Sequence, residues 1–334
     1  MIILGIDTSC DDTSVAVSEG ARLLSNVVSS QVPVHRLFGG VVPEIASRKH
    51  AELIDAVYGE ALSQAGVTLK DVDVLGVTQG PGLIGSVLVG LCFVKGLALA
   101  TGKRLVGVNH VEAHAMSVLI EREVEFPFIA LIVSGGHTVL LYFEEACRFR
   151  LIGTTRDDAA GEAFDKAAKY LSLGYPGGSV IEGLARGGRA DAVAFPRPMA
   201  DERNYDFSYS GLKTAFINYV KHNGITDDDR CDILASFQEA AFDLLALKTL
   251  RACRDMGVKR LVVGGGVAAN GRLREMLTER CRAQGVSVFF PSPALCTDNA
   301  AMVAVTAWLY AGKGLFSALD ARAFSRMALR VEGC

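Results

Sequence analysis

Two histidines four residues apart, His110 and His114, form a pattern in the sequence that could bind a metal. On a helix, side chains at positions i and i+4 project from one face, so both imidazoles can bind one metal ion. A zinc protease needs its glutamate directly after the first histidine, whereas Glu112 stands two residues after it, about 200° round the helix. A protease is therefore disfavoured. Asp298, before a distant helix, is the candidate third ligand, although on spacing alone a helix N-cap is the favoured role for it.

A second cluster of chemical groups lies in the turn after the first apolar run. Asp7, Asp11 and Asp12 lie within six residues, among the hydroxyls of Thr8, Ser9 and Thr13. Clustered carboxylates repel one another, which favours a neighbouring cation or a metal-bound phosphate. The alternative is a hairpin turn rich in Asx hydrogen bonds.

Two glycine-rich loops are typical of close contact between a backbone and a ligand. Ser134, Gly135, Gly136 and His137 follow one strand-like run and could direct amide N–H groups at an anion, although any tight hairpin also favours Gly-Gly. Residues 264–270 (GGGVAAN) lie between a strand and a helix, where a nucleotide could rest on the backbone. They lack the Lys-Ser/Thr of a Walker loop and the GxGxxG spacing. Asn270 could equally be an ordinary N-cap.

The segment 186–213 combines cationic and aromatic side chains. Arg186, Arg189, Arg197, Arg203 and Lys213 alternate there with Tyr205, Phe207 and Tyr209. This mixture suits RNA phosphates and stacked bases, and a solvated loop with a few buried aromatic rings fits it equally well. The acids at 157, 158, 162 and 165 precede or begin a helix and are typical of a solvated helix start.

The elements that must position these groups occur twice. Strand-like runs at 2–6, 14–18 and 23–28 recur at 128–133, 138–143 and 149–152, about 126 residues later. We expect two related domains that face each other across a cleft. Between and after these runs, helices and strands alternate, which predicts an α/β architecture. The helices are expected at 44–65, 84–100, from 110, 160–171, 210–222, 228–256, 270–283 and 298–311, the strands at 73–78, 104–108, 260–263 and 286–290, and loops, including a turn at 174–178, from 172 to about 208.

Length and composition set the broad class. The 334 residues favour two domains, half of them are apolar, and the charged share of 21% excludes a disordered chain. The net charge is −3, so a polyanionic partner must be bound by a local basic surface. The eight cysteines form no CxxC and are expected to be reduced thiols. The first residues are expected to form a strand, and no apolar run reaches the roughly 20 residues of a membrane span, so we expect a cytoplasmic protein.

Taken together, ten collinear motifs resemble one family, the bacterial TsaD family (also called Gcp or YgjD) of tRNA adenosine threonylcarbamoyltransferases. They lie at 5–13 (GIDTSCDDT), 39–44, 81–83, 109–114 (NHVEAH), 133–138 (VSGGHT), 157–166, 175–178, 207–214, 264–270 and 296–299 (CTDN). The resemblance implies the duplicated actin, sugar-kinase and Hsp70-like (ribonuclease-H-like) fold with a central cleft. We expect a first domain at 1–126, completed by residues from about 305 to 334, and a second domain at 127–304.

The resemblance also implies the reaction and its participants. The threonylcarbamoyl group of threonylcarbamoyl-AMP would pass to the exocyclic amine of the adenosine that follows the anticodon, in tRNAs reading codons that begin with adenine. One divalent metal, Fe²⁺ or alternatively Zn²⁺, would be held by His110, His114 and Asp298. ATP or ADP could occupy the cleft, and the expected partners are tRNA, the paralogous TsaB and the ATPase TsaE. The substrate-binding residues implied are Val133, Ser134, Gly135, Gly136, His137, Asp165, Gly178, Glu182 and Asn270.

Several points stay open at the level of sequence. Asp11 and Asp12 are candidates for the general base from position alone, and Asp12 stands where the family commonly has Glu. Residues 322–326 differ from the family's usual Arg-x-Arg-Trp-Pro ending, so the resemblance implies no tail contacts. The alternative function is a small-molecule kinase on the same fold, which would not need the histidine pair. A non-catalytic scaffold for paralogous subunits is a third.

Overall fold

The computed structural model describes residues 1–328, and these divide into two compact units. The first comprises Met1–Val124, Ala146–Arg148 and the chain from Pro291; the second comprises Glu125–Glu145 and Phe149–Phe290. The sequence placed these boundaries at 126/127 and 304/305, whereas the contacts place them at 124/125 and 290/291. The chain returns to the first unit earlier because residues 291–299 already pack there; residues 329–334 of the expected first domain lie outside the described part.

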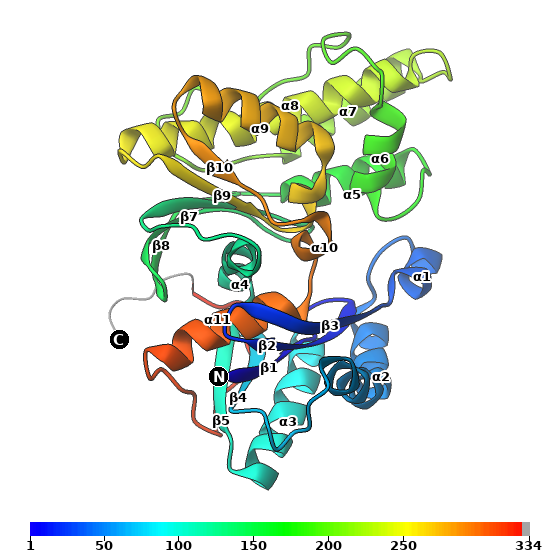
Figure 1. Cartoon of the computed structure of the whole chain (residues 1–334). Coiled ribbons are helices and arrows are strands. Elements are labelled where there is room, and N and C mark those ends of the chain that lie inside the picture. Colours follow the sequence, from blue (N-terminus) through cyan, green and yellow to red (C-terminus); the bar gives the residue numbers. More distant parts are fainter. Residues whose placement is uncertain (329–334) are drawn as a thin grey trace. The chain divides into compact units, whose positions relative to one another are not determined.

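The first unit is built on a five-stranded sheet in the order β3-β2-β1-β4-β5 (Figure 1). β1 pairs antiparallel with β2 and parallel with β4, β2 pairs antiparallel with β3, and β4 pairs parallel with β5. The strands are β1 (Ile2–Asp7), β2 (Asp12–Glu19), β3 (Arg22–Ser30), β4 (Val74–Gly80) and β5 (Arg104–Asn109).

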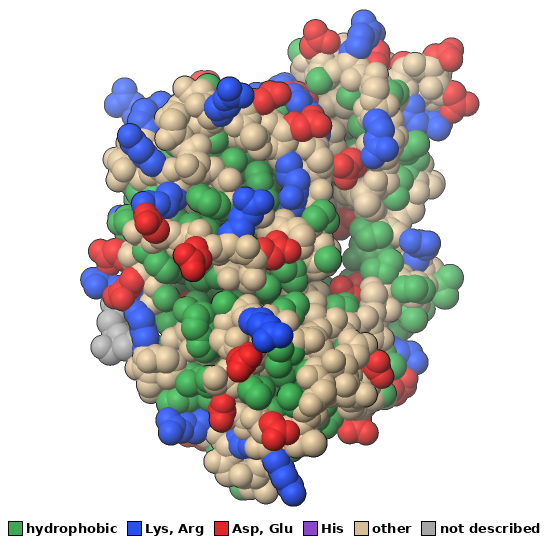
Figure 2. All heavy atoms as spheres, viewed as in Figure 1, with side chains coloured by type: hydrophobic (Ala, Val, Ile, Leu, Met, Phe, Trp, Pro, Cys, Tyr) green, Lys and Arg blue, Asp and Glu red, His purple; other side chains and the backbone are tan. Residues whose placement is uncertain are grey.

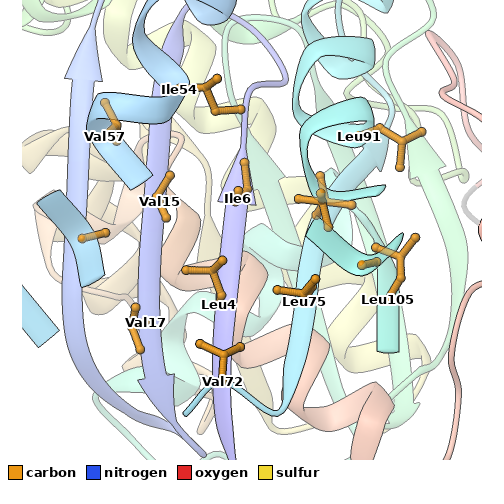
Figure 3. Close-up of a cluster of buried hydrophobic side chains, with 14 residues drawn as sticks. Leu4, Ile6, Val15, Val17, Ile54, Val57, Val72, Leu75, Leu91 and Leu105 are labelled. Carbon is orange, nitrogen blue, oxygen red and sulfur yellow. The ribbon is translucent and has the colours of Figure 1, made fainter. Parts of the chain in front are cut away.

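Helices cover both faces of this sheet because β1 is apolar on both faces. Ile3 packs in the cluster that contains the side chains of α11, whereas Leu4 and Ile6 pack in the cluster that contains those of α2 and α3 (Figure 3). A Cβ at Gly5 would lie 2.6 Å from backbone atoms of α11, so glycine is required for this close approach. The helical segments of the unit are α1 (Val32–His35), η1 (Arg36–Phe38), α2 (Pro43–Ala65), α3 (Ile84–Thr101), α4 (His110–Met116), η2 (Ser117–Ile120), α10 (Pro293–Cys296) and α11 (Ala300–Gly312).

The second unit repeats the same sheet plan, with the order β10-β9-β6-β7-β8. β6 pairs antiparallel with β7 and parallel with β9, and β9 pairs parallel with β10. The duplication predicted from the strand-like runs is therefore confirmed: this is the duplicated α/β fold of the actin type. The strands are β6 (Phe128–Val133), β7 (Thr138–Glu145), β8 (Arg148–Thr154), β9 (Arg260–Gly264) and β10 (Ser287–Phe289).

The helices of the second unit include one that the sequence did not predict. Residues 172–208 were expected to be loops, with a turn at 174–178, but Gly177 and Gly178 begin helix α6. Two glycines lower the helix propensity of this start, and the helix forms because Ile181 and Ala185 are buried. The helical segments are α5 (Ala160–Tyr170), α6 (Gly177–Ala185), α7 (Ser210–Asn223), α8 (Arg230–Asp255), η3 (Gly266–Ala269) and α9 (Gly271–Ala283).

Among the described residues, α3 is the one helix long and apolar enough to cross a membrane. A core helix passes the same test of length and composition, so this is weak evidence for a membrane span. One face of α3 is buried in the first unit, and its other face exposes Ile84, Leu88 and Leu99.

Candidate functional site

The two histidines lie on α4, which begins directly after β5. Asn109, the last residue of β5, is the N-cap, and its side-chain oxygen accepts hydrogen bonds from the N–H groups of Val111 (2.9 Å) and Glu112 (3.3 Å). This cap starts the helix at His110, so His110 and His114 share one face, with ring centroids 4.7 Å apart. Both side chains are buried in the first unit.

Asp298 completes this cluster from the other end of the chain. The N-cap role expected for it belongs to Asn299, whose side-chain oxygen accepts the N–H of Met302 at the start of α11 (3.2 Å). The carboxylate of Asp298 is therefore directed to the histidines: its Oδ1 lies 3.2 Å from His114 Nε2 and 3.5 Å from His110 Nε2. The structure thus brings together the three residues predicted as metal ligands.

This donor set fits a single divalent metal. The three ligand atoms all lie within 4.8 Å of one another. Tetrahedral ligands at about 2.1 Å from a metal lie about 3.4 Å apart, close to the two observed separations. His110 Nδ1 also lies 3.6 Å from Asp7 Oδ2. A carboxylate behind a histidine is the usual support for a metal ligand, so Asp7 belongs to the site. Its position at the end of β1 was the signal in the sequence, but Asp7 was not singled out from its neighbours.

The electrostatics of the cluster also favour a cation. Burial by itself would raise the pKa of Asp298, but the charge and hydrogen bonds of His110 and His114 hold it well below its ordinary value. Burial raises the pKa of Asp7. Burial would lower the pKa of His110, but Asp298 and Asp7 together raise it. A positive charge is therefore stabilised among these side chains, and a metal ion can supply it in place of a proton.

Glu112 lies on a different face of α4, as the helical spacing predicted. It is buried, and its Oε2 accepts a hydrogen bond from the hydroxyl of Tyr310 on α11 (2.8 Å). Burial raises its pKa to about 8. Glu112 is directed to α11 instead of the metal ligands, so the arrangement is not that of a zinc protease.

The turn between β1 and β2 carries Asp11 and Asp12. Part of it is an Asx turn, since Asp7 Oδ1 accepts the N–H of Ser9 (3.1 Å). Burial raises the pKa of Asp11, and it raises that of Asp12 to about 7. The charge of Asp298 contributes in the same direction to both, so the two carboxylates lie within electrostatic range of the metal ligands.

The loop 133–137 of the second unit is a tight hairpin turn. The N–H of Ser134 donates to the carbonyl of His137 (2.8 Å), and the N–H of His137 donates to Ser134 Oγ (3.2 Å). No atom lies within 4 Å of the positions that a Cβ would take at Gly135 and Gly136, so the backbone there is open to a ligand. A Cβ at Gly161 would lie 2.5 Å from Ser134 O, so the loop packs directly on the start of α5.

Three of the other predicted substrate-binding residues make hydrogen bonds to helix starts or neighbouring side chains within the second unit. Asp165 Oδ1 accepts the N–H of Gly177 at the start of α6 (2.7 Å), and Glu182 Oε1 accepts the N–H of Gly271 at the start of α9 (2.8 Å). Asn270 caps α9 and its amide donates to Gln238 Oε1 (3.0 Å), so the N-cap role is present. A cavity of about 290 Å³ adjoins this group, lined in part by Glu182, Arg186, Gln238 and Gly271.

The segment 186–213 is not an aromatic and basic surface, and it fits the alternative of a loop with a few buried aromatic rings. Phe207 and Tyr209 are fully buried, so they cannot stack on bases. Arg189, Arg197 and Lys213 form ion pairs with Asp232, Asp243 and Asp158. Spacing alone could not show these partners, since the first two lie on α8 and more than 40 residues away. Arg186, Arg189 and Arg203 are the exposed cations of the original set, and Arg186 and Arg203 remain as candidates for RNA contact because Arg189 is held by Asp232.

Asp157 and Asp158 hold the start of α7 instead of forming a solvated helix face. Asp157 Oδ1 accepts the N–H of Tyr209 (2.7 Å), and Asp157 Oδ2 accepts the hydroxyls of Ser208 and Ser210 (2.6 Å each). Asp158 bonds both Lys166 and Lys213 at 2.6 Å.

Solved structures support the fold. Full-length HypF in a phosphate- and nucleotide-bound form superposes with a TM-score of 0.66 at 14% identity, over 96% of this chain and 47% of HypF. Component A of the (R)-2-hydroxyglutaryl-CoA dehydratase of Acidaminococcus fermentans superposes with a TM-score of 0.52 at 16% identity, over 93% of this chain and 99% of that protein. At such identities the likeness concerns the fold.

Sequence relatives are much closer. Proteins called tRNA N6-adenosine threonylcarbamoyltransferase are 50% identical in Syntrophotalea carbinolica, over 100% of this chain and 98% of the relative, and 50% identical in Geotalea uraniireducens, over 96% and 94%. The family model described as TsaD, tRNA N6-adenosine threonylcarbamoyltransferase, matches residues 22–305. With its buried histidine and aspartate cluster and its duplicated fold, the chain belongs to the TsaD family of tRNA-modifying transferases.

Proposed function

We propose that this transferase moves the threonylcarbamoyl group of threonylcarbamoyl-AMP to the exocyclic amine of the adenosine that follows the anticodon, in tRNAs reading codons that begin with adenine. Family membership supports threonylcarbamoylation of tRNA adenosine. The observation that carries the mechanism is the convergence of His110, His114 and Asp298 on one point. A kinase of the same fold has no need of such a group.

His110, His114 and Asp298 would hold one divalent metal. Two imidazoles and one carboxylate suit Fe²⁺, and they suit Zn²⁺ as the alternative. When bound, the metal would supply Lewis-acid polarisation of the threonylcarbamoyl carbonyl. Asp7, behind His110, would fix the orientation of that ring.

The transfer forms a C–N bond between the adenine amine and the carbamoyl carbon and breaks the bond between that carbon and the bridging phosphate oxygen, which leaves with AMP. The amine is a weak nucleophile because its lone pair is delocalised into the ring, so positioning must contribute much of the rate. The amine also loses a proton. Asp12 is the better candidate for the base, because its pKa near 7 matches the pH at which it must accept a proton, and Asp11 is the alternative.

The second unit would bind the adenylate. The open backbone at Gly135, Gly136 and Gly178 permits close approach of phosphate and ribose. Val133, Ser134 and His137 form the rest of that turn, while Asp165, Glu182 and Asn270 hold the starts of α6 and α9 in the same unit. ATP or ADP could occupy the same residues.

We propose tRNA, the paralogous TsaB and the ATPase TsaE as partners, in the cytoplasm. The exposed apolar side chains of α3, Ile84, Leu88 and Leu99, support a protein partner on the first unit, because such a stripe is unusual on a lone soluble protein.

The decisive experiment is a transfer assay with unmodified tRNA, threonine, bicarbonate, ATP and the partner proteins, followed by mass spectrometry of the nucleosides. We expect threonylcarbamoyladenosine at the position after the anticodon with the wild type and none with His114→Ala. ATP consumption without this nucleoside, together with phosphorylation of a small molecule, would support the kinase alternative instead.

A further inference from the structure

The segment between β3 and α2 carries an exposed apolar tip at η1. Leu37 is 83% exposed and Phe38 is 54% exposed, and both belong to the single turn η1. Arg36, beside them, is also exposed. Gly39, with φ of 66°, ends the turn, and nothing lies within 4 Å of a Cβ position there or at Gly40. Figure 2 shows hydrophobic side chains gathered over this protrusion, with a cationic side chain next to them.

Hydrogen bonds hold the segment that carries the tip, so its exposure is not that of a loose loop. His35, directly before η1, is fully buried. Its Nε2 lies 3.2 Å from Gln31 Oε1, and its Nδ1 accepts the N–H of Val42 (3.3 Å). One buried imidazole therefore ties the two ends of the segment together.

The same hydrogen-bond network reaches the turn that carries Asp11 and Asp12. Gln31 Nε2 lies 3.4 Å from His50 Nδ1, and the N–H of Gln31 donates to the carbonyl of Asp11 (3.0 Å). The fully buried His50 ring also bonds Thr13 Oγ1 (2.8 Å) and the Cys10 carbonyl (3.0 Å). The position of the tip is thereby fixed relative to the candidate general bases.

We propose that Phe38 is a nucleobase-stacking contact for the anticodon loop of the tRNA, with Leu37 and the exposed side chain of Arg36 beside it. This inference rests on the proposed function. Single-stranded RNA loops are recognised by aromatic stacking next to arginine. The tip is joined by hydrogen bonds to the turn that carries the candidate bases, and the target adenosine must bind near those bases. This link favours RNA over a protein as the occupant.

The test uses the complete chain, saturated with its metal, and an anticodon stem-loop RNA in which 2-aminopurine replaces one loop purine at a time. Stacking on Phe38 quenches 2-aminopurine fluorescence. Phe38→Ala should remove this quenching at one loop position and weaken RNA binding about 5- to 150-fold. Phe38→Trp should restore both, and Phe38→Leu should not. Leu319→Ala, at an apolar residue of similar exposure in the same unit, is the matched control and should change neither.

Each outcome has a definite meaning. If Phe38→Ala lowers complex formation with the partner proteins and leaves RNA quenching unchanged, the tip is a protein contact and the inference is wrong. If Phe38→Leu binds RNA as well as the wild type, the contact is not aromatic stacking and the inference is also wrong. Failure of the proposed function would show differently, as a wild-type protein that never forms threonylcarbamoyladenosine in the complete assay.

Discussion

At the scale of single residues, the proposed metal ligands His110, His114 and Asp298 should tolerate substitution least. His114→Ala removes one of its three donor atoms. Loss of a residue that merely supports a ligand costs about 10- to 100-fold in metal affinity, so loss of a ligand should cost at least about 100-fold. We expect the variant to lose its metal in elemental analysis by mass spectrometry and to lose transfer activity.

Glu112→Gln is the matched control for that experiment. Glu112 is equally buried and lies on the same helix, but it bonds Tyr310. The Glu112→Gln variant should keep the metal. Full metal occupancy in a His110→Ala, His114→Ala double variant would show that the metal lies elsewhere.

The raised pKa of Asp12 predicts that the stability of the protein depends on pH. Its folded-state pKa of about 7 lies above the ordinary 3.8, so the folded state binds the proton more tightly. Its contribution to stability is fully present below about pH 4 and is lost as the pH rises through 7. In the metal-free protein, Asp12→Asn should therefore raise the melting temperature relative to wild type at pH 8 and have little effect at pH 4.

The same substitution should lower transfer activity about 10²- to 10⁴-fold if Asp12 is the base. Asp55→Asn, at an exposed carboxylate of α2, serves as the control for both measurements. An Asp12→Asn effect on melting that is the same at pH 4 and pH 8 would contradict the shifted pKa.

At the scale of elements, two glycine-rich loops that look alike in sequence have different requirements. Gly265 has φ of 89°, and a Cβ there would lie 2.4 Å from Val133 O on the neighbouring strand β6. Gly265→Ala should lower the free energy of unfolding by about 2 kcal/mol or more, measured by urea denaturation. That glycine is needed for packing, so its loss reports on the fold before it reports on a ligand.

Gly136→Ala provides the matched comparison. A Cβ there meets nothing within 4 Å, so stability should change by no more than about 0.5 kcal/mol. Calorimetry with a threonylcarbamoyl-AMP analogue should nevertheless show weaker binding, because the methyl group occupies the space of the ligand. Unchanged binding would place the adenylate away from this turn.

Features that depend on one short-range signal could be predicted from the sequence. The duplicated hairpins follow from apolar runs, and the shared face of His110 and His114 follows from helical spacing. Neighbouring residues that compete for one role could not be separated: only the fold shows that Asn299 caps α11 and leaves Asp298 to the histidines. Burial of Phe207 and Tyr209 likewise depends on tertiary packing, which overrides composition.

At the scale of the whole molecule, the net charge of −3 predicts weak, salt-sensitive binding of tRNA by this chain alone. Arg186→Glu with Arg203→Glu should weaken tRNA binding and lower the slope of log affinity against log salt by about 1 to 2, because each lost phosphate contact removes nearly one released counterion. Filter binding at several salt concentrations measures this. An unchanged slope would mean that neither arginine contacts a phosphate.

Arg197→Glu should behave differently. Arg197 bonds Asp243 (3.0 Å) and the carbonyl of Phe195 (2.6 Å), so its loss should appear first as a lower melting temperature. A double variant that includes Arg197 would confuse the two effects.

Because the chain returns to its first unit near its C-terminus, the ribosome synthesises the residues of the histidine and aspartate cluster at different times. His114 and Asp298 are 184 residues apart in sequence, so translation at 5 to 20 residues per second separates them by about 10 to 40 s. A nascent chain displays both imidazoles throughout that interval without the carboxylate that completes the donor set. Loading of the proposed metal would therefore be a late step of biogenesis, and a message broken between codons 291 and 297 would yield a product with the second unit intact and the metal site unfinished.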